Sequence, residues 1–103
     1  MKLTKALPLI AIMAFTAPAI ATAQDKAAEQ CELAVQIAEA IMQNRQAGTP
    51  ISKMMEIADG NQTIIGLILV AYDTPRFSTQ EYQLQAVTDF SNEVGLACYK
   101  GQI

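Results

Sequence analysis

Two cysteines, Cys31 and Cys98, constrain what this sequence can fold into more than any other feature. They are the only cysteines of the chain, and they stand far apart in the sequence, Cys98 close to the C-terminus and Cys31 in the first third. A disulfide between them closes a loop of nearly a whole small domain, which stabilises the folded state by about 4 kcal/mol in the chain-entropy estimate. The alternative is a redox-active pair, but such cysteines usually stand two residues apart in a Cys-x-x-Cys turn. We therefore predict a structural disulfide.

A structural disulfide needs an oxidising compartment, and the N-terminus predicts export to one. Residues 1–23 read MKLTKALPLIAIMAFTAPAIATA: two lysines, a short apolar run, and small residues at Ala21 and Ala23. This order is typical of a signal peptide cleaved before Gln24. The alternative is a retained membrane anchor, but the apolar run is interrupted by proline and is shorter than the roughly 20 residues that span a bilayer. We expect residues 24–103 to form one domain in the periplasm or outside the cell.

The charge of the chain excludes two classes of partner. It has ten acidic and seven basic residues, and two of the lysines leave with the signal peptide. The remaining basic residues, Lys26, Arg45, Lys53, Arg76 and Lys100, form no cluster. Nucleic acid and anionic lipid both require clustered Lys and Arg. We therefore expect no nucleic-acid partner and no stable membrane insertion after cleavage.

The spacing of apolar residues predicts an all-α, compact, small four-helix domain. Apolar residues recur at steps of three, four and seven, which is the period of an amphipathic helix. Cys31 and Cys98 fall on the apolar faces of the first and last helices, so the disulfide joins these two and favours an antiparallel pair. The predicted helices span residues 25–46, 50–59, 62–73 and 79–99.

The third of these segments, QTIIGLILVAYD, is also compatible with a buried strand because it is rich in Ile and Val. A single strand among helices would leave its backbone groups without ladder partners. We therefore predict a central, buried helix. Within it, Gly66 is expected to allow a neighbouring helix to approach closely.

The helix ends are marked by local signals. Gly48, Gly60 and Gly101 are expected to end the first, second and fourth helices, because glycine adopts the left-handed conformation that follows many helices. Thr49 is expected to cap the second helix, with Pro50 at its first position, and Asn61 to cap the third.

The stretch AYDTPRFSTQEY, residues 71–82, separates the last two helices. Pro75 ends one helix, and Ser78 with Glu81 has the spacing of a capping box for the next. Phe77 and Tyr82 flank that box as a hydrophobic staple would. These signals leave the guanidinium of Arg76 unexplained.

The sequence resembles a group of small exported helical proteins of bacteria and their phages that carry one cysteine pair and have no assigned activity. The resemblance covers residues 31–98. It is carried by MQNRQ followed by Ala-Gly, by MME, by AYDTPRFSTQEYQ and by FSNEVGLAC. It implies export and a helical fold, and it implies no catalytic residue.

The residue inventory favours binding over catalysis. The sequence contains no histidine, which removes Ser-His and Cys-His nucleophile pairs and the commonest metal ligand. We expect no enzyme activity, no metal site and no cofactor. Carboxylates three or four residues apart, such as Asp89 and Glu93, are more often a solvated helix face than an acid–base pair.

Two classes of function remain. The first is a binding module that acts on a protein partner in the periplasm as an inhibitor, an exclusion factor or an immunity protein. The second is a chaperone that loosens in acid or under stress, which without histidine would depend on carboxylates that titrate at about pH 3 to 5. For the first, the candidate contacts are Arg and aromatic residues at the end of the first helix and around the last turn, with one acid: Arg45, Tyr72, Asp73, Arg76 and Phe77.

We predict that the exported protein begins at Gln24 and has no free thiol. Intact-mass spectrometry of the purified protein, with and without reduction before alkylation, measures both properties. A product that retains residues 1–23, or one that takes up alkylating agent without reduction, would contradict the prediction.

Overall fold

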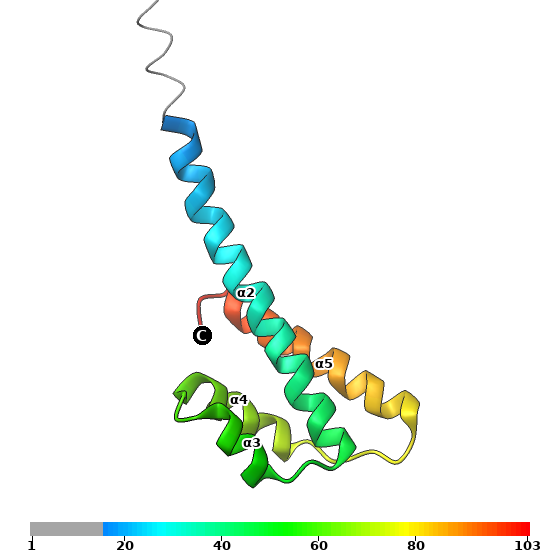
Figure 1. Ribbon diagram of the computed structural model, residues 1–103. Coiled ribbons are helices and arrows are strands. Elements are labelled where there is room, and N and C mark those ends of the chain that lie inside the picture. Colours follow the sequence, from blue (N-terminus) through cyan, green and yellow to red (C-terminus); the bar gives the residue numbers. More distant parts are fainter. Residues whose placement is uncertain (1–15) are drawn as a thin grey trace, which may run out of the picture. The chain divides into compact units, whose positions relative to one another are not determined.

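The computed structural model describes the backbone of residues 16–103 and the side chains from Lys26 onward. Over this part of the chain it contains four helices and no strand, as predicted (Figure 1). The chain divides into two units, Met1–Gln30 and Cys31–Ile103, and the fold described below is that of the second. The predicted signal peptide lies outside the described residues over positions 1–15.

Helix α2 (Thr16–Ala47) begins earlier than residue 25, the predicted start. The sequence before residue 25 is rich in alanine, which favours a helix, and Pro18 falls in the first turn, where a missing amide hydrogen is tolerated. The helix ends as predicted at Gly48, whose φ is +91°. The Gly48 amide donates to the Arg45 carbonyl at 3.1 Å and the Thr49 amide to the Asn44 carbonyl at 3.0 Å, which is a Schellman motif.

Helices α3 (Ile51–Ala58) and α4 (Gln62–Asp73) pack against each other (Figure 1). The predicted cap of α4 is confirmed, because Asn61 Oδ1 accepts from the Ile64 amide at 3.1 Å. The predicted cap of α3 is wrong. Pro50 occupies the N-cap position, and the Thr49 hydroxyl donates instead to Asn44 Oδ1 at 3.0 Å, because the Schellman motif brings Thr49 back over the end of α2.

Helix α4 is confirmed as a helix, but it is not buried on all sides. Only Ile68 and Ala71 are fully enclosed, whereas Leu69 and Val70 remain about half exposed. The prediction for Gly66 is also wrong, since a Cβ added there would meet nothing within 4 Å. The close approach occurs at Gly95 of α5, where an added Cβ would lie 2.9 Å from Val35 Cγ2 on α2.

Helix α5 (Gln80–Tyr99) is capped by Thr79 and not by the predicted Ser78–Glu81 box. Thr79 Oγ1 accepts from the Tyr82 amide at 3.4 Å. Both Ser78 and Thr79 carry a hydroxyl suited to capping, so the sequence alone allows either position. The predicted aromatic contact is present, with the Phe77 and Tyr82 ring centroids 6.1 Å apart.

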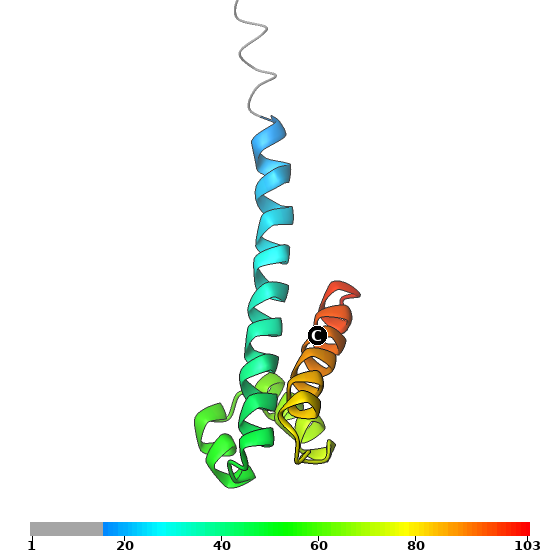
Figure 2. The ribbon, with the colours of Figure 1, turned by 90° about the vertical axis from the view of Figure 1, so that its right-hand side faces the viewer.

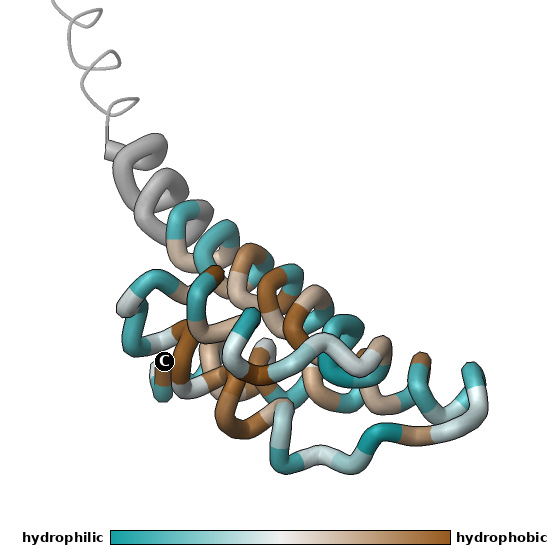
Figure 3. The backbone as a smooth tube through the Cα atoms, turned by 60° about the horizontal axis from the view of Figure 1, so that its bottom comes forward, coloured by the Kyte–Doolittle hydropathy of each residue, from teal (hydrophilic) through white to brown (hydrophobic). Residues whose placement is uncertain are grey.

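In the second unit, α5 runs back beside α2 in the opposite direction (Figures 1 and 2). The predicted disulfide joins Cys31 to Cys98, whose Cα atoms are 5.5 Å apart. All four helices contribute to one core, in which Met42 and Ile68 are the largest fully buried side chains. In Figure 3 the apolar stretches, drawn in brown, gather where the helices approach one another.

One feature of the fold bears on where the protein resides. A disulfide is typical of a non-reducing, extracellular-type compartment. Among the helices of the described region, none has the length and apolarity needed to cross a bilayer.

The two helical glycines give a matched pair of substitutions. We predict that Gly66→Ala raises the free energy of unfolding by about 0.5–1 kcal/mol, because alanine costs less backbone entropy in a helix and has free space here. The free energy of unfolding of Gly95→Ala should instead be about 1–3 kcal/mol lower than that of Gly66→Ala, because the added methyl group collides with the stiff Val35 side chain. Urea unfolding of both variants measures this difference, and equal stabilisation by both would contradict the close packing of α2 and α5.

Candidate functional site

The turn between α4 and α5 is held to the end of α2 by one buried side chain, that of Gln46. Gln46 is only 3% exposed. Its Nε2 donates to the Pro75 carbonyl at 2.9 Å, and its Oε1 accepts from the Phe77 amide at 2.8 Å. A buried amide is stable only when both of its ends are satisfied, and here both are satisfied by the turn. We call this pair of hydrogen bonds the Gln46 clamp.

Phe77 is fixed from its other side as well. Gln83, on the first turns of α5, donates from Nε2 to the Phe77 carbonyl at 2.7 Å. The amide and the carbonyl of Phe77 are therefore both bonded to glutamine side chains, one from α2 and one from α5. This fixes the direction in which the chain enters α5.

Arg45 and Tyr72, two of the predicted contact residues, lie beside the clamp. Arg45 Nε donates to the Thr74 carbonyl at 3.0 Å, and its guanidinium carbon lies 5.1 Å from the centre of the Tyr72 ring. The Tyr72 hydroxyl donates to the Thr49 carbonyl at 2.7 Å. Partial burial raises the pKa of Tyr72, while the positive charge of Arg45 acts in the opposite direction. Both side chains therefore help to hold α4 against the end of α2.

Arg76 has a structural partner that the sequence did not indicate. Its Nε donates to the Gln46 carbonyl at 2.9 Å, which is one of the carbonyls left free at the end of α2. Its guanidinium also lies against Gly48, where an added Cβ would come within 3.0 Å of Arg76 Cζ. Arg76 is exposed on its remaining surface, as is Asp73 at the end of α4.

The five predicted contact residues are thus brought together around one turn, and three of them have hydrogen bonds that explain their residue types. Arg45, Tyr72 and Arg76 each bond a backbone carbonyl across the junction of α2 and the turn. The residue that sequence reasoning missed is Gln46. The only available signal was its position just before the helix-ending Gly48, because glutamine is otherwise an ordinary helix residue.

A groove lies between α4 and α5, next to the turn. The hollow there has a volume of about 370 Å³ and is lined by Val70 of α4, by Thr74 and Phe77 of the turn, by Tyr82, Phe90 and other residues of α5, and by Met42 of α2. Val70 and Tyr82 are each more than half exposed. Apolar side chains left open to water in a hollow are typical of contact surfaces.

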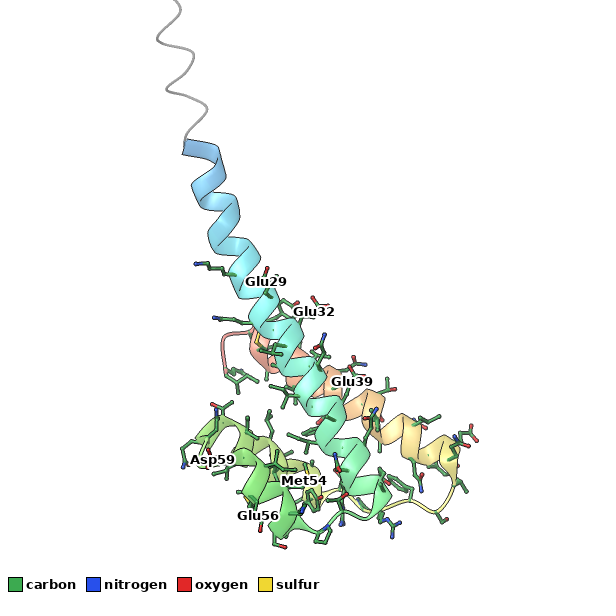
Figure 4. All side chains as sticks on the ribbon, in the orientation of Figure 1. Glu29, Glu32, Glu39, Met54, Glu56 and Asp59 are labelled. Atoms are coloured by element: carbon green, nitrogen blue, oxygen red, sulfur yellow. A yellow bond between two sulfur atoms is a disulfide. The ribbon has the colours of Figure 1, made fainter. Side chains whose placement is uncertain are left out.

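The described carboxylates show no arrangement suited to a metal. In Figure 4, Glu32 and Glu39 lie along α2, and Glu56 and Asp59 lie apart from them on and just after α3. Within the described residues, no group of three or more Asp, Glu, His or Cys side chains is close enough together to hold a metal ion.

A second hollow of about 240 Å³, between α2 and the α3–α4 pair, is almost entirely apolar and is lined by residues such as Ile37, Met54 and Ile64.

We predict that Gln46→Ala lowers the free energy of unfolding by about 2 kcal/mol, because it leaves the Phe77 amide and the Pro75 carbonyl without their partner. The matched control is Gln43→Ala, one turn earlier on the exposed side of α2, which should change stability by less than about 0.5 kcal/mol. Urea unfolding followed by circular dichroism measures both. Equal effects of the two substitutions would show that the clamp adds no stability.

The isosteric change Gln46→Glu should make stability depend on pH. An ionised carboxylate cannot donate to the Pro75 carbonyl, so the folded state favours the protonated acid and raises its pKa above the usual value of about 4.3. A raised folded-state pKa means that stability is lost as pH rises through it. The free energy of unfolding of the variant should therefore approach that of the wild type below about pH 4 and be lower than that of the wild type at pH 7. Unfolding curves at the two pH values measure this change, and a deficit that does not vary with pH would contradict it.

Comparison with known proteins leaves the site to be interpreted from its own residues. No protein-family model, no curated protein and no solved structure matches this chain. The function proposed below therefore depends on the groove, the clamped turn and the disulfide.

Proposed function

We propose that residues 31–103 form a binding module that acts in the periplasm, or after secretion, by contacting another protein. The observation that carries this proposal is the groove between α4 and α5, where Val70 and Tyr82 keep more than half of their surface open to water. An exposed aromatic beside an apolar hollow is the kind of feature that anchors protein interfaces. An inhibitor, exclusion or immunity protein would use such a surface to cover its target.

The groove is held in shape before any partner arrives. The disulfide fixes the end of α5 at Cys98, and the Gln46 clamp with Gln83 fixes the entry to α5 at Phe77. A preorganised surface loses little conformational freedom on binding, so more of the contact energy remains as affinity.

The predicted contact residues divide into two roles in this proposal. Phe77 lines the groove and would contact the partner directly. Arg45, Tyr72 and Arg76 would position the turn that carries Phe77, while their exposed atoms and the Asp73 carboxylate remain free to contribute at the edge.

Binding is preferred to catalysis because the usual reactive side chains are missing or occupied. The sequence has no histidine, and both cysteines form the disulfide. The second candidate, an acid- or stress-responsive chaperone, is favoured by large apolar side chains that are exposed away from the groove, among them Ile57, Leu84 and Leu96. It differs in requiring the fold to loosen before a client binds.

Val70→Lys tests the binding module, with Leu69→Lys as its matched control. Both positions are on α4 and about half exposed, but only Val70 lines the groove. Immobilised mature protein should retain a partner from a periplasmic extract at pH 7. We expect Leu69→Lys to retain this partner and Val70→Lys to lose at least about 90% of it, because a buried ammonium is costly at an apolar interface.

Three results would contradict the binding module or place its contact surface outside the groove. Retention of the same partner by both variants would place the contact outside the groove. Retention of nothing at pH 7 would contradict the module. Client capture only at about pH 3, together with loss of the near-ultraviolet dichroism signal, would establish the chaperone instead.

A further inference from the structure

The groove between α4 and α5 extends beyond the hollow described above. A smaller hollow of about 160 Å³ adjoins it and is lined by Val94, Ala97 and Ile103, and these two hollows share Val70, Phe90 and Glu93. Because they have these walls in common, they are successive parts of one groove.

The wall contributed by α5 sets the length of this groove. It follows Tyr82, Gln85, Asp89, Glu93 and Ala97, which are steps of three and four along one face of the helix. At 1.5 Å per residue, this stripe is about 22 Å long, or roughly four helical turns. A partner helix of four turns matches this length, and a partner strand would find no sheet edge among the described residues.

The charges around the groove are of one sign. Its lining includes two carboxylates, Asp89 and Glu93, one turn apart on α5, and no Lys or Arg. The remainder of the lining is mainly apolar. An occupant that matches it carries an apolar stripe with positive charges beside it, because complementary charge at the edge of an interface directs association.

A second copy of this chain does not match that description. In the second unit the basic residues Arg45, Lys53, Arg76 and Lys100 stand singly, and the whole chain has a net charge of −3. Two such copies would bring like charges together, which disfavours association.

We infer that the groove binds one amphipathic α-helix of a partner protein, about four turns long, whose apolar side lies on Val70, Tyr82 and Ile103, the lining residues that keep more than half of their surface open to water. Lys or Arg residues at its edge pair with Asp89 and Glu93. This inference rests on the proposed function and names the chemistry of the partner.

A library of defined peptides tests it. The probe is a phage-displayed set of 16-residue helices with a fixed apolar stripe, in which the flanking positions vary among Lys, Glu, Gln and Ser. Selection on the disulfide-bonded protein at pH 7 should retain peptides enriched in Lys over Glu at those positions. For a retained peptide, fluorescence anisotropy should show affinity about three- to tenfold weaker for the double variant Asp89→Asn/Glu93→Gln, which is the size expected for two exposed ion pairs. The same peptide should bind more weakly as the salt concentration rises.

The control is Glu32→Gln/Glu39→Gln, which removes two carboxylates from α2 and leaves the groove unchanged. It should bind the peptide as the wild type does, whereas Val70→Lys should weaken binding at least about tenfold. The inference is overturned if no peptide is retained, if the retained peptides show no basic enrichment, or if the α2 control weakens binding as much as the groove variant. A cellular partner that still depends on Val70 while every peptide fails would leave the proposed function standing and exclude a basic helix.

Discussion

The position of α5 depends on constraints at both of its ends. At its C-terminal end the disulfide ties Cys98 to Cys31, and at its N-terminal end two glutamine side chains hold the backbone of Phe77. Between these ends α5 contributes to the core mainly through Val87, Phe90 and Val94. Because the helix is fixed at both ends, the face that it turns toward α4 keeps its shape although much of it is open to water.

The four helices and the disulfide were predictable from the sequence because both depend on local or unambiguous signals. An apolar period of 3.6 residues predicts a helix wherever it occurs, and two cysteines allow only one intramolecular pair. Asn61 and Gly48 act through neighbours within four residues, and both were predicted correctly. The Ser78 cap and the Thr49 cap were wrong because an adjacent residue or a nearby helix end offered a competing hydrogen bond.

The clamp was not predictable for a different reason. Gln46 and Phe77 are far apart in the sequence, and nothing in the residue type of a glutamine indicates that it will be buried. Arg76 illustrates the same limit, since its partner is a backbone carbonyl, which every residue possesses. Gly66 and Gly95 show it for packing: both lie within helices, and only the crossing of α2 and α5 decides which glycine needs to lack a side chain.

The groove follows from the way in which this small domain is stabilised. A core of few large side chains gives limited stability to a domain of this size, and the disulfide adds stability by restricting the unfolded chain, without requiring further apolar burial. Apolar residues such as Val70 and Tyr82 can then remain at the surface without loss of the fold. The apolar pattern along the sequence does not distinguish these residues from the core, because α4 is apolar around most of its circumference. The disulfide was the clearest feature of the sequence, and the groove was the feature that the sequence predicted least. The first allows the second, because the stability that the disulfide adds lets an apolar groove edged by Asp89 and Glu93 stay open to water.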